Sequence, residues 1–292
     1  NELAWAADAQ LGSCRLNRAL RSREAALAIA RQLAERNPGS RSLELDVAYR
    51  YAGLAGVHSR LGRNGDASAH LAEALSTIRS LLARDPSSQK LREDLAYYQL
   101  GYARSLRQQG ALPDAEAALD EALPTLQATA LDARATNADR DTRLNVLEET
   151  ARLALAGQDE ARAGAALDRH RRLRTEFAHA ERAFSPGFER LITYRYLAWR
   201  LDRRDPATLD PSLLDTLPRT TSAYRGCAEA DAAARHAFLI GDRELLAEQV
   251  DYLDRADYGD RDYRAFCRTA RVCVEAEQSA VEWDHMQRGD YL

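Results

Sequence analysis

Residues 43–75 decide the fold, and they read LELDVAYRYAGLAGVHSRLGRNGDASAHLAEAL. Residues 91–123 read LREDLAYYQLGYARSLRQQGALPDAEAALDEAL. An offset of 48 residues superimposes the two segments. The coinciding pairs are Asp46 with Asp94, Ala48 with Ala96, Tyr49 with Tyr97, Gly53 with Gly101, Gly62 with Gly110, Ala67 with Ala115, Leu71 with Leu119, Ala74 with Ala122, and Leu75 with Leu123. So many matches at one offset indicate an internal repeat.

The repeat extends in both directions from this pair of segments. Toward the N-terminus, Ala19, Ala26, Leu27 and Leu33 coincide with Ala67, Ala74, Leu75 and Leu81. Cys14 takes the position of the turn residue Gly62. Toward the C-terminus, residues 144–167 form a degenerate unit around Gly157, in which we expect the register to slip by about one residue. Such drift is typical of the last units of a repeat array.

Each unit reads as two helices. The first is expected to run from Asn37-Pro38 to just before Gly62, because Asn caps a helix and Pro is tolerated in its first turn. Glycine then supplies the left-handed residue that ends a helix. The second helix is expected to begin near Asp66, where apolar residues recur at spacings of three and four. The equivalent positions of the next unit carry the same signals.

The spacing of small residues resembles that of the tetratricopeptide repeat (TPR) family. A turn glycine, a small residue five later and an alanine seven beyond that occur as Gly62, Ala67, Ala74 and again as Gly110, Ala115, Ala122. The family's usual repeat is shorter by about 14 residues, or roughly two helical turns per helix. The chain lacks the family's Trp and Leu-Gly in the first helix. Over residues 1 to about 180, the resemblance implies an all-α solenoid of lengthened helical hairpins.

Composition limits the classes of function. The chain has 292 residues, 45% of them hydrophobic, and its net charge of -4 gives no reason to expect nucleic acid as a partner. No apolar run approaches the roughly 20 residues that cross a bilayer, so we expect no membrane contact. Histidine pairs at metal-binding spacing, phosphate loops and nucleophile motifs are absent from the sequence. We therefore predict no metal site, no cofactor and no catalytic residue.

The C-terminal part departs from the repeat. We predict TPR-like repeats in residues 1–183 and a second helical region in residues 184–292, which either continues the solenoid as divergent repeats or caps it. Its expected helices are Phe188–Arg204, Ala223–Ile240, Arg243–Arg255 and Arg261 to about Arg288, with a proline-punctuated loop after the first. The acidic cluster Asp254, Asp257, Asp260 and Asp262 is interpreted as helix caps and a solvated turn.

Cysteine positions bear on the cellular compartment. Cys227, Cys267 and Cys273 gather in the C-terminal part. The last two are too far apart along one helix to bond each other, and the register favours a Cys227–Cys267 disulfide. The alternative is three buried thiols. A disulfide would indicate an oxidising compartment.

Candidate binding residues follow from the resemblance, because the first helix of each TPR unit lines the concave groove that binds partners. The family's groove positions correspond to Tyr49, Arg60, Tyr97, Arg104 and Arg107. Tyrosine offers contact area with a polar tip, and arginine offers bidentate capture of a carboxylate. An acidic peptide or a carboxyl terminus would suit this set. The alternative is that the tyrosines belong to the interhelical core and the arginines serve solubility.

The repeat style also resembles the TPR regions of bacterial transmembrane serine/threonine kinases and of membrane-tethered winged-helix regulators. The residues on which this resemblance rests are Asp85-Pro86, Asp94-Leu95-Ala96 and Gly110. The resemblance implies a periplasmic or other extracytoplasmic sensor or interaction domain that binds a protein or peptide. We expect a fragment of a longer protein, with the kinase in another part, and leave open whether it forms a homodimer. The alternatives are a cytoplasmic scaffold without a signalling role and an enzyme with an unrecognised site.

Overall fold

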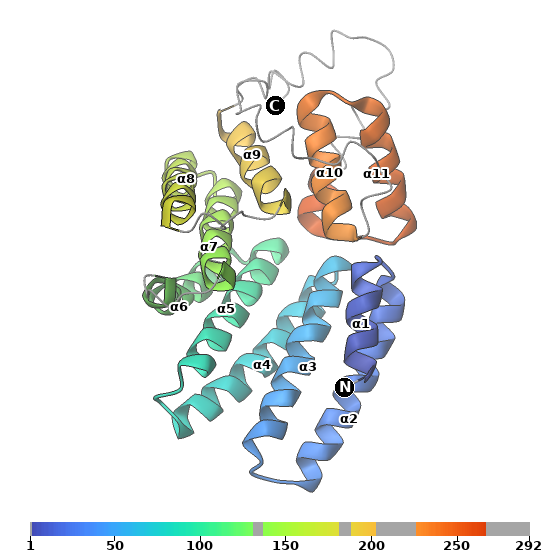
Figure 1. The fold of residues 1–292 in the computed structure, drawn as a ribbon, viewed down its shortest axis with the longest axis vertical. Helices are drawn as coiled ribbons and strands as arrows, with labels where there is room; N and C mark the ends of the chain where they lie inside the picture. The colour runs from blue at the N-terminus through green and yellow to red at the C-terminus, as the bar shows by residue number, and fades with distance from the viewer. Residues whose placement is uncertain (1, 131–136, 181–187, 203–225, 267–292) are drawn as a thin grey trace.

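The computed structural model describes residues 2–130, 137–180, 188–202 and 226–266, and these residues are almost entirely helical (Figure 1). Within these ranges no residue belongs to a β-strand, which confirms the all-α prediction. The helices are α1 (Glu2–Gly12), α2 (Leu16–Arg36), α3 (Arg41–Arg60), α4 (Asn64–Arg84), α5 (Gln89–Gln109), α6 (Leu112–Ala130), α7 (Asn137–Ala156), α8 (Glu160–Ala180), α9 (Phe188–Asp202), α10 (Cys227–Ile240) and α11 (Arg243–Arg255). In these ranges no helix has both the length and the apolar character needed to cross a membrane.

Consecutive helices pack against one another from α1 to α9. Figure 1 shows α1 to α5 side by side, while α10 and α11 lie beyond the upper ends of α1 and α3. In addition, α5 contacts α7 and α7 contacts α9, so these first helices of successive pairs form an inner layer. The predicted boundary at residue 183 and the predicted proline-rich loop lie outside the described residues.

The turn inside each helix pair has the same geometry at four positions that are 48 residues apart. Cys14, Gly62, Gly110 and Gln158 all have left-handed backbones, with φ of 56°, 74°, 89° and 61°. In each turn, the backbone amide of the residue after the left-handed one donates a hydrogen bond to a carbonyl of the preceding helix. These bonds run from Arg15 N to Gln10 O, Arg63 N to His58 O, Ala111 N to Leu106 O, and Asp159 N to Ala154 O, at 2.8–3.0 Å. The expected register slip at Gly157 is therefore wrong, because the left-handed residue is Gln158.

Alanines set the spacing between helices in the interior. Ala48 on α3 and Ala67 and Ala74 on α4 are fully buried and pack in one cluster with larger side chains such as Leu75 and Ile78. A small residue at these positions lets two helix backbones approach, and the neighbouring aliphatic side chains fill the remaining space. The short spacing explains why the same positions stay small in the next unit.

The C-terminal helices are tied to the first helix pair by a disulfide. Cys227, the first residue of α10, bonds to Cys14 in the turn between α1 and α2, with a Cα–Cα distance of 5.1 Å. The predicted Cys227–Cys267 pairing is therefore wrong, since a cysteine forms one disulfide, and Cys267 lies outside the described residues. The physical reason is that α10 lies at the end of α1, which brings together cysteines 213 residues apart.

Residues 256–262, which we call the closing segment, run along the turn edge of the stack. Ala256 and Asp257 lie beside the α1–α2 turn, where they share a cavity wall with Cys14. At the next turn, the Gly259 amide donates to the Arg60 carbonyl at 2.7 Å. Gly62 and Gly259 lie very close together. A Cβ on Gly62 would collide with the Gly259 carbonyl oxygen, and a Cβ on Gly259 would collide with the Leu61 carbonyl oxygen. The closing segment thus requires glycine on both sides of this contact.

Substitution at Gly62 should therefore cost more than at its repeat equivalent, Gly110. Both have left-handed backbones, which cost an L side chain about 1 kcal/mol. A Cβ at Gly110 meets nothing within 4 Å, so Gly110→Ala should cost only that strain. Gly62→Ala also displaces the closing segment, so it should lower the free energy of unfolding by about 3 kcal/mol. Urea denaturation of both variants tests this, and equal losses would contradict the contact.

Loss of the Cys14–Cys227 disulfide should loosen the C-terminal helices. We expect a Cys14→Ser/Cys227→Ser double variant to lose about 2–4 kcal/mol of unfolding free energy, because the bond closes a long loop. Dithiothreitol should lower the stability of the unmodified chain to the level of the double variant and leave the variant unchanged. If dithiothreitol left the urea midpoint of the unmodified chain unchanged, the disulfide would not be formed.

Candidate functional site

Four of the five predicted groove residues line one cavity of about 620 Å³: Tyr49, Arg60, Tyr97 and Arg104. The first two come from α3 and the others from α5. Asn145 of α7, Ala228 of α10, and Tyr258 and Asp260 of the closing segment complete the wall. We call this the larger cavity. The fold therefore brings the sequence-predicted positions together, and adds a wall from the C-terminal helices that the repeat pattern did not indicate.

The two sequence-predicted tyrosines of the larger cavity, Tyr49 and Tyr97, differ in how far they are engaged by other residues. The Tyr49 hydroxyl donates to Asp94 Oδ2 at 2.9 Å, and burial together with Asp94 raises the pKa of Tyr49 to about 12. Tyr97 is 58% exposed, and its ring meets the buried ring of Tyr98 edge-on. Tyr49 is thus part of an interhelical contact as well as the cavity wall. Tyr97 is the aromatic surface that remains available for a ligand.

Of the three arginines that line the larger cavity, Arg23 pairs with Asp8, and the two sequence-predicted ones, Arg60 and Arg104, differ from each other. Among the described residues, no carboxylate forms an ion pair with Arg60, whose backbone carbonyl holds the closing segment. Arg104 donates from Nε to Glu149 at 3.3 Å and keeps 36% of its side chain exposed. Both guanidinium groups therefore retain N–H groups that a carboxylate on a ligand would satisfy.

Arg107, the fifth predicted residue, does not line the larger cavity. It is 8% exposed and donates from Nε to Glu149 at 2.5 Å and through its two terminal nitrogens to Asp262 at 2.8 and 2.6 Å. Burial alone would raise the pKa of Glu149, but Arg107, Arg104 and Arg152 outweigh it and hold that pKa below its ordinary value. Arg107 is a structural residue that joins α5, α7 and the closing segment, which corrects its predicted role.

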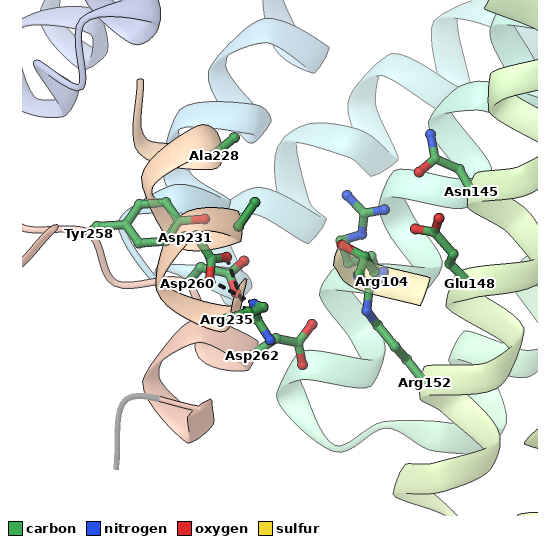
Figure 2. A pocket seen from close by; sticks show the side chains of 12 residues that line it. Arg104, Asn145, Glu148, Arg152, Ala228, Asp231, Arg235, Tyr258, Asp260 and Asp262 are labelled. Atoms are coloured by element: carbon green, nitrogen blue, oxygen red, sulfur yellow. Dashed lines mark hydrogen bonds and ion pairs between the residues drawn. The ribbon is translucent and has the colours of Figure 1, made fainter. Parts of the chain in front are cut away.

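A second, smaller cavity of about 190 Å³ adjoins the first and shares Arg104, Asn145, Ala228, Tyr258 and Asp260 with it. Figure 2 shows its two charged walls. One wall carries Arg104, Asn145, Glu148 and Arg152 from α5 and α7; the other carries Asp231, Arg235, Tyr258, Asp260 and Asp262 from α10 and the closing segment. We call this the smaller cavity.

Sequence reasoning missed most of the smaller cavity. Asp231 and Arg235 lie four residues apart within the alanine-rich α10, and Arg235 donates to Asp231 at 2.8 and 3.2 Å. The Arg235 guanidinium also lies over the rings of Tyr196 and Phe266, at 4.9 and 5.1 Å from their centroids. Burial raises the pKa of Asp231 despite this partner. An i,i+4 charge pair inside an apolar helix was the available signal for a buried polar site.

The interpretation of the acidic cluster as caps and a solvated turn is correct only in part. Asp260 does cap, since its Oδ1 accepts from the Tyr263 amide at 3.0 Å. Asp262, however, is engaged by Arg107, and Asp254 pairs with Arg264 at 3.2 Å. Across the described ranges, no group of three His, Cys, Asp or Glu side chains is arranged to hold a metal ion.

Substitutions on α5 should separate the structural arginine from the cavity arginine. Arg107→Gln leaves the buried Glu149 and Asp262 short of a partner and should lower the free energy of unfolding by about 3 kcal/mol. Arg104→Gln, three residues earlier and partly exposed, should cost about 1 kcal/mol or less. Urea unfolding followed by circular dichroism measures both, and similar losses would contradict the distinction.

Comparison of the chain with protein-family models, with curated proteins and with solved structures gives no significant match. The geometry of the two cavities is therefore the basis on which a function is assigned.

Proposed function

We propose that this chain is a protein- or peptide-binding domain of TPR-like repeats, and that its larger cavity binds an acidic segment of a partner. The observation that carries the proposal is that the exposed Tyr97 and the arginines Arg60 and Arg104 line one cavity.

The repeat geometry supports the TPR-like assignment. Left-handed residues at 14, 62, 110 and 158 return at the 48-residue interval of the sequence repeat, each with the same amide-to-carbonyl closure. Identical turns at a fixed interval place successive helix pairs in similar orientations, which is how a solenoid grows. In such an array the first helices form a continuous inner surface, and α3, α5 and α7 all contribute to the larger cavity.

The chemistry of the cavity favours an acidic ligand. Arg60 has no carboxylate partner among the described residues, and Arg104 donates only one hydrogen bond, to Glu149. Arginine forks match a carboxylate in two parallel hydrogen bonds, and a tyrosine ring adds apolar contact. A volume of about 620 Å³ falls in the range of ligand sites and would hold a few residues of an extended chain.

The Cys14–Cys227 disulfide supports placing this binding domain in an oxidising compartment, because such bonds are rare in the cytosol. An extracytoplasmic sensor or interaction domain, of the kind attached to bacterial receptor kinases, meets that requirement. In this role the domain would report binding of its partner to other parts of a longer protein.

Binding to an array of short fluorescent peptides tests the proposal. Peptides rich in Asp and Glu should bind more tightly than their Asn and Gln counterparts. Arg60→Gln and Tyr97→Ala should each weaken binding about tenfold or more, since buried arginine and tyrosine anchors carry most of the energy of such contacts. Fluorescence anisotropy measures the affinity.

Arg79→Gln is the matched control, because Arg79 lies on α4 and pairs with Glu121 of α6, away from the cavity. It should leave peptide affinity unchanged. The proposal fails if no acidic peptide binds, or if Arg79→Gln weakens binding as much as Arg60→Gln.

A further inference from the structure

The α5–α7 wall of the smaller cavity carries two arginines whose hydrogen-bonding capacity is only partly used. Arg104, Arg107 and Arg152 surround Glu149, whose side chain is 1% exposed, and Arg107 also binds Asp262. With Glu148, which lines the same wall, three guanidinium groups face three carboxylates. Arg107 makes the short contacts, whereas Arg104 and Arg152 each donate one long hydrogen bond to Glu149 within the described ranges, at 3.3 and 3.4 Å. Arg104 and Arg152 line the smaller cavity, so they keep N–H groups there that a carboxylate on a ligand would satisfy.

The opposite wall carries an uncompensated negative charge at Asp260. Its oxygens accept from the Tyr263 amide at 3.0 Å and from Gln108 Nε2 at 3.2 Å, which are neutral donors. No arginine of the described ranges forms an ion pair with it. Asp231, by contrast, is engaged by Arg235 through two hydrogen bonds. Glu148 belongs to the α5–α7 wall, where its Oε1 lies 3.3 Å from His170 Nε2.

The two partly satisfied arginines and Asp260 face one another across the cavity. Arg104 and Asp260 line the same cavity but make no ion pair with each other. Figure 2 shows Arg104 and Arg152 on one side of the space between α7 and α10, and Asp260 on the other side beside Arg235. A volume of about 190 Å³ corresponds to about six water molecules, since each takes roughly 30 Å³ in the liquid. That is enough space for a small organic ion.

A ligand of one sign would leave the other wall uncompensated, and a partly desolvated charge without a partner is costly. A zwitterion satisfies both walls at once. From these charges and this volume we infer that the smaller cavity binds a free α-amino acid, with the carboxylate on Arg104 and Arg152 and the ammonium group on Asp260. This small-molecule site goes beyond the proposed peptide binding and does not depend on it.

Calorimetry and thermal shift with free amino acids test the inference. Each of the twenty is offered to the full chain, and at least one should bind and raise the melting temperature. For each that binds, the N-acetyl derivative lacks the ammonium charge and the amide derivative lacks the carboxylate, while the side chain stays the same. Both derivatives should bind at least tenfold more weakly. Absence of binding at millimolar concentrations, or equal binding of an N-acetyl derivative, would overturn the inference.

Two variants locate the site. Arg152→Gln should weaken amino acid binding at least tenfold but leave peptide affinity unchanged, because Arg152 does not line the larger cavity. Asp260→Asn can still cap Tyr263, and it should lose the preference for the free amino acid over its N-acetyl derivative. Asp251→Asn, an exposed residue paired with Arg255, is the control and should change nothing.

These measurements distinguish failure of the inference from failure of the proposed function. Peptide binding without amino acid binding would refute the inference alone, and the reverse result would refute the peptide proposal alone. Full amino acid affinity in both Arg152→Gln and Asp260→Asn would place the bound amino acid elsewhere and overturn the assignment to the smaller cavity.

Discussion

The arrangement of both cavities depends on one backbone contact, the hydrogen bond from the Gly259 amide to the Arg60 carbonyl. Side chains at Gly62 or Gly259 would hold the closing segment away from the turn edge. Because Tyr258 and Asp260 flank this contact, their positions in the cavity walls follow from it. Without the closing segment, α3 and α5 would present an open surface. With it, the same helices form one side of the larger cavity.

Buried charge explains why the closing segment docks in a single register. The largely buried Arg107 forms ion pairs with two carboxylates from different parts of the chain, Glu149 and Asp262. Such a group gains little net stability over an apolar contact, because desolvation opposes the ion-pair attraction. A shifted register would, however, remove Asp262 from the buried Arg107 guanidinium and leave its two terminal nitrogens without this carboxylate. The network therefore mainly specifies the register in which the closing segment docks. A planar guanidinium serves this better than an ammonium group would, because it donates to both carboxylates in fixed directions.

Local features were predictable from sequence, and long-range ones were not. The repeat register placed Cys14 with Gly62 and Gly110, and all three residues have left-handed backbones. The disulfide partner of Cys14 depends instead on how α10 returns to α1, which no local pattern encodes. The same division separates Arg104 from Arg107. Both lie on the inner side of α5, but only the position of Asp262, 155 residues later, makes Arg107 structural. Sequence spacing identified the helix surface, whereas the closing segment decided which side chains stay available.

The shared wall has a consequence for how the two proposed ligands would interact. Arg104 and Asp260 line both cavities. A carboxylate bound to Arg104 from the smaller cavity would occupy the N–H groups that an acidic peptide would use from the larger one, so the two ligands would compete for one donor. Linkage makes such an effect reciprocal: whatever factor the amino acid imposes on peptide affinity, the peptide imposes on amino acid affinity. Because Arg60 and Tyr97 belong to the larger cavity alone, the peptide would keep part of its contacts, and the expected coupling is partial antagonism instead of exclusion.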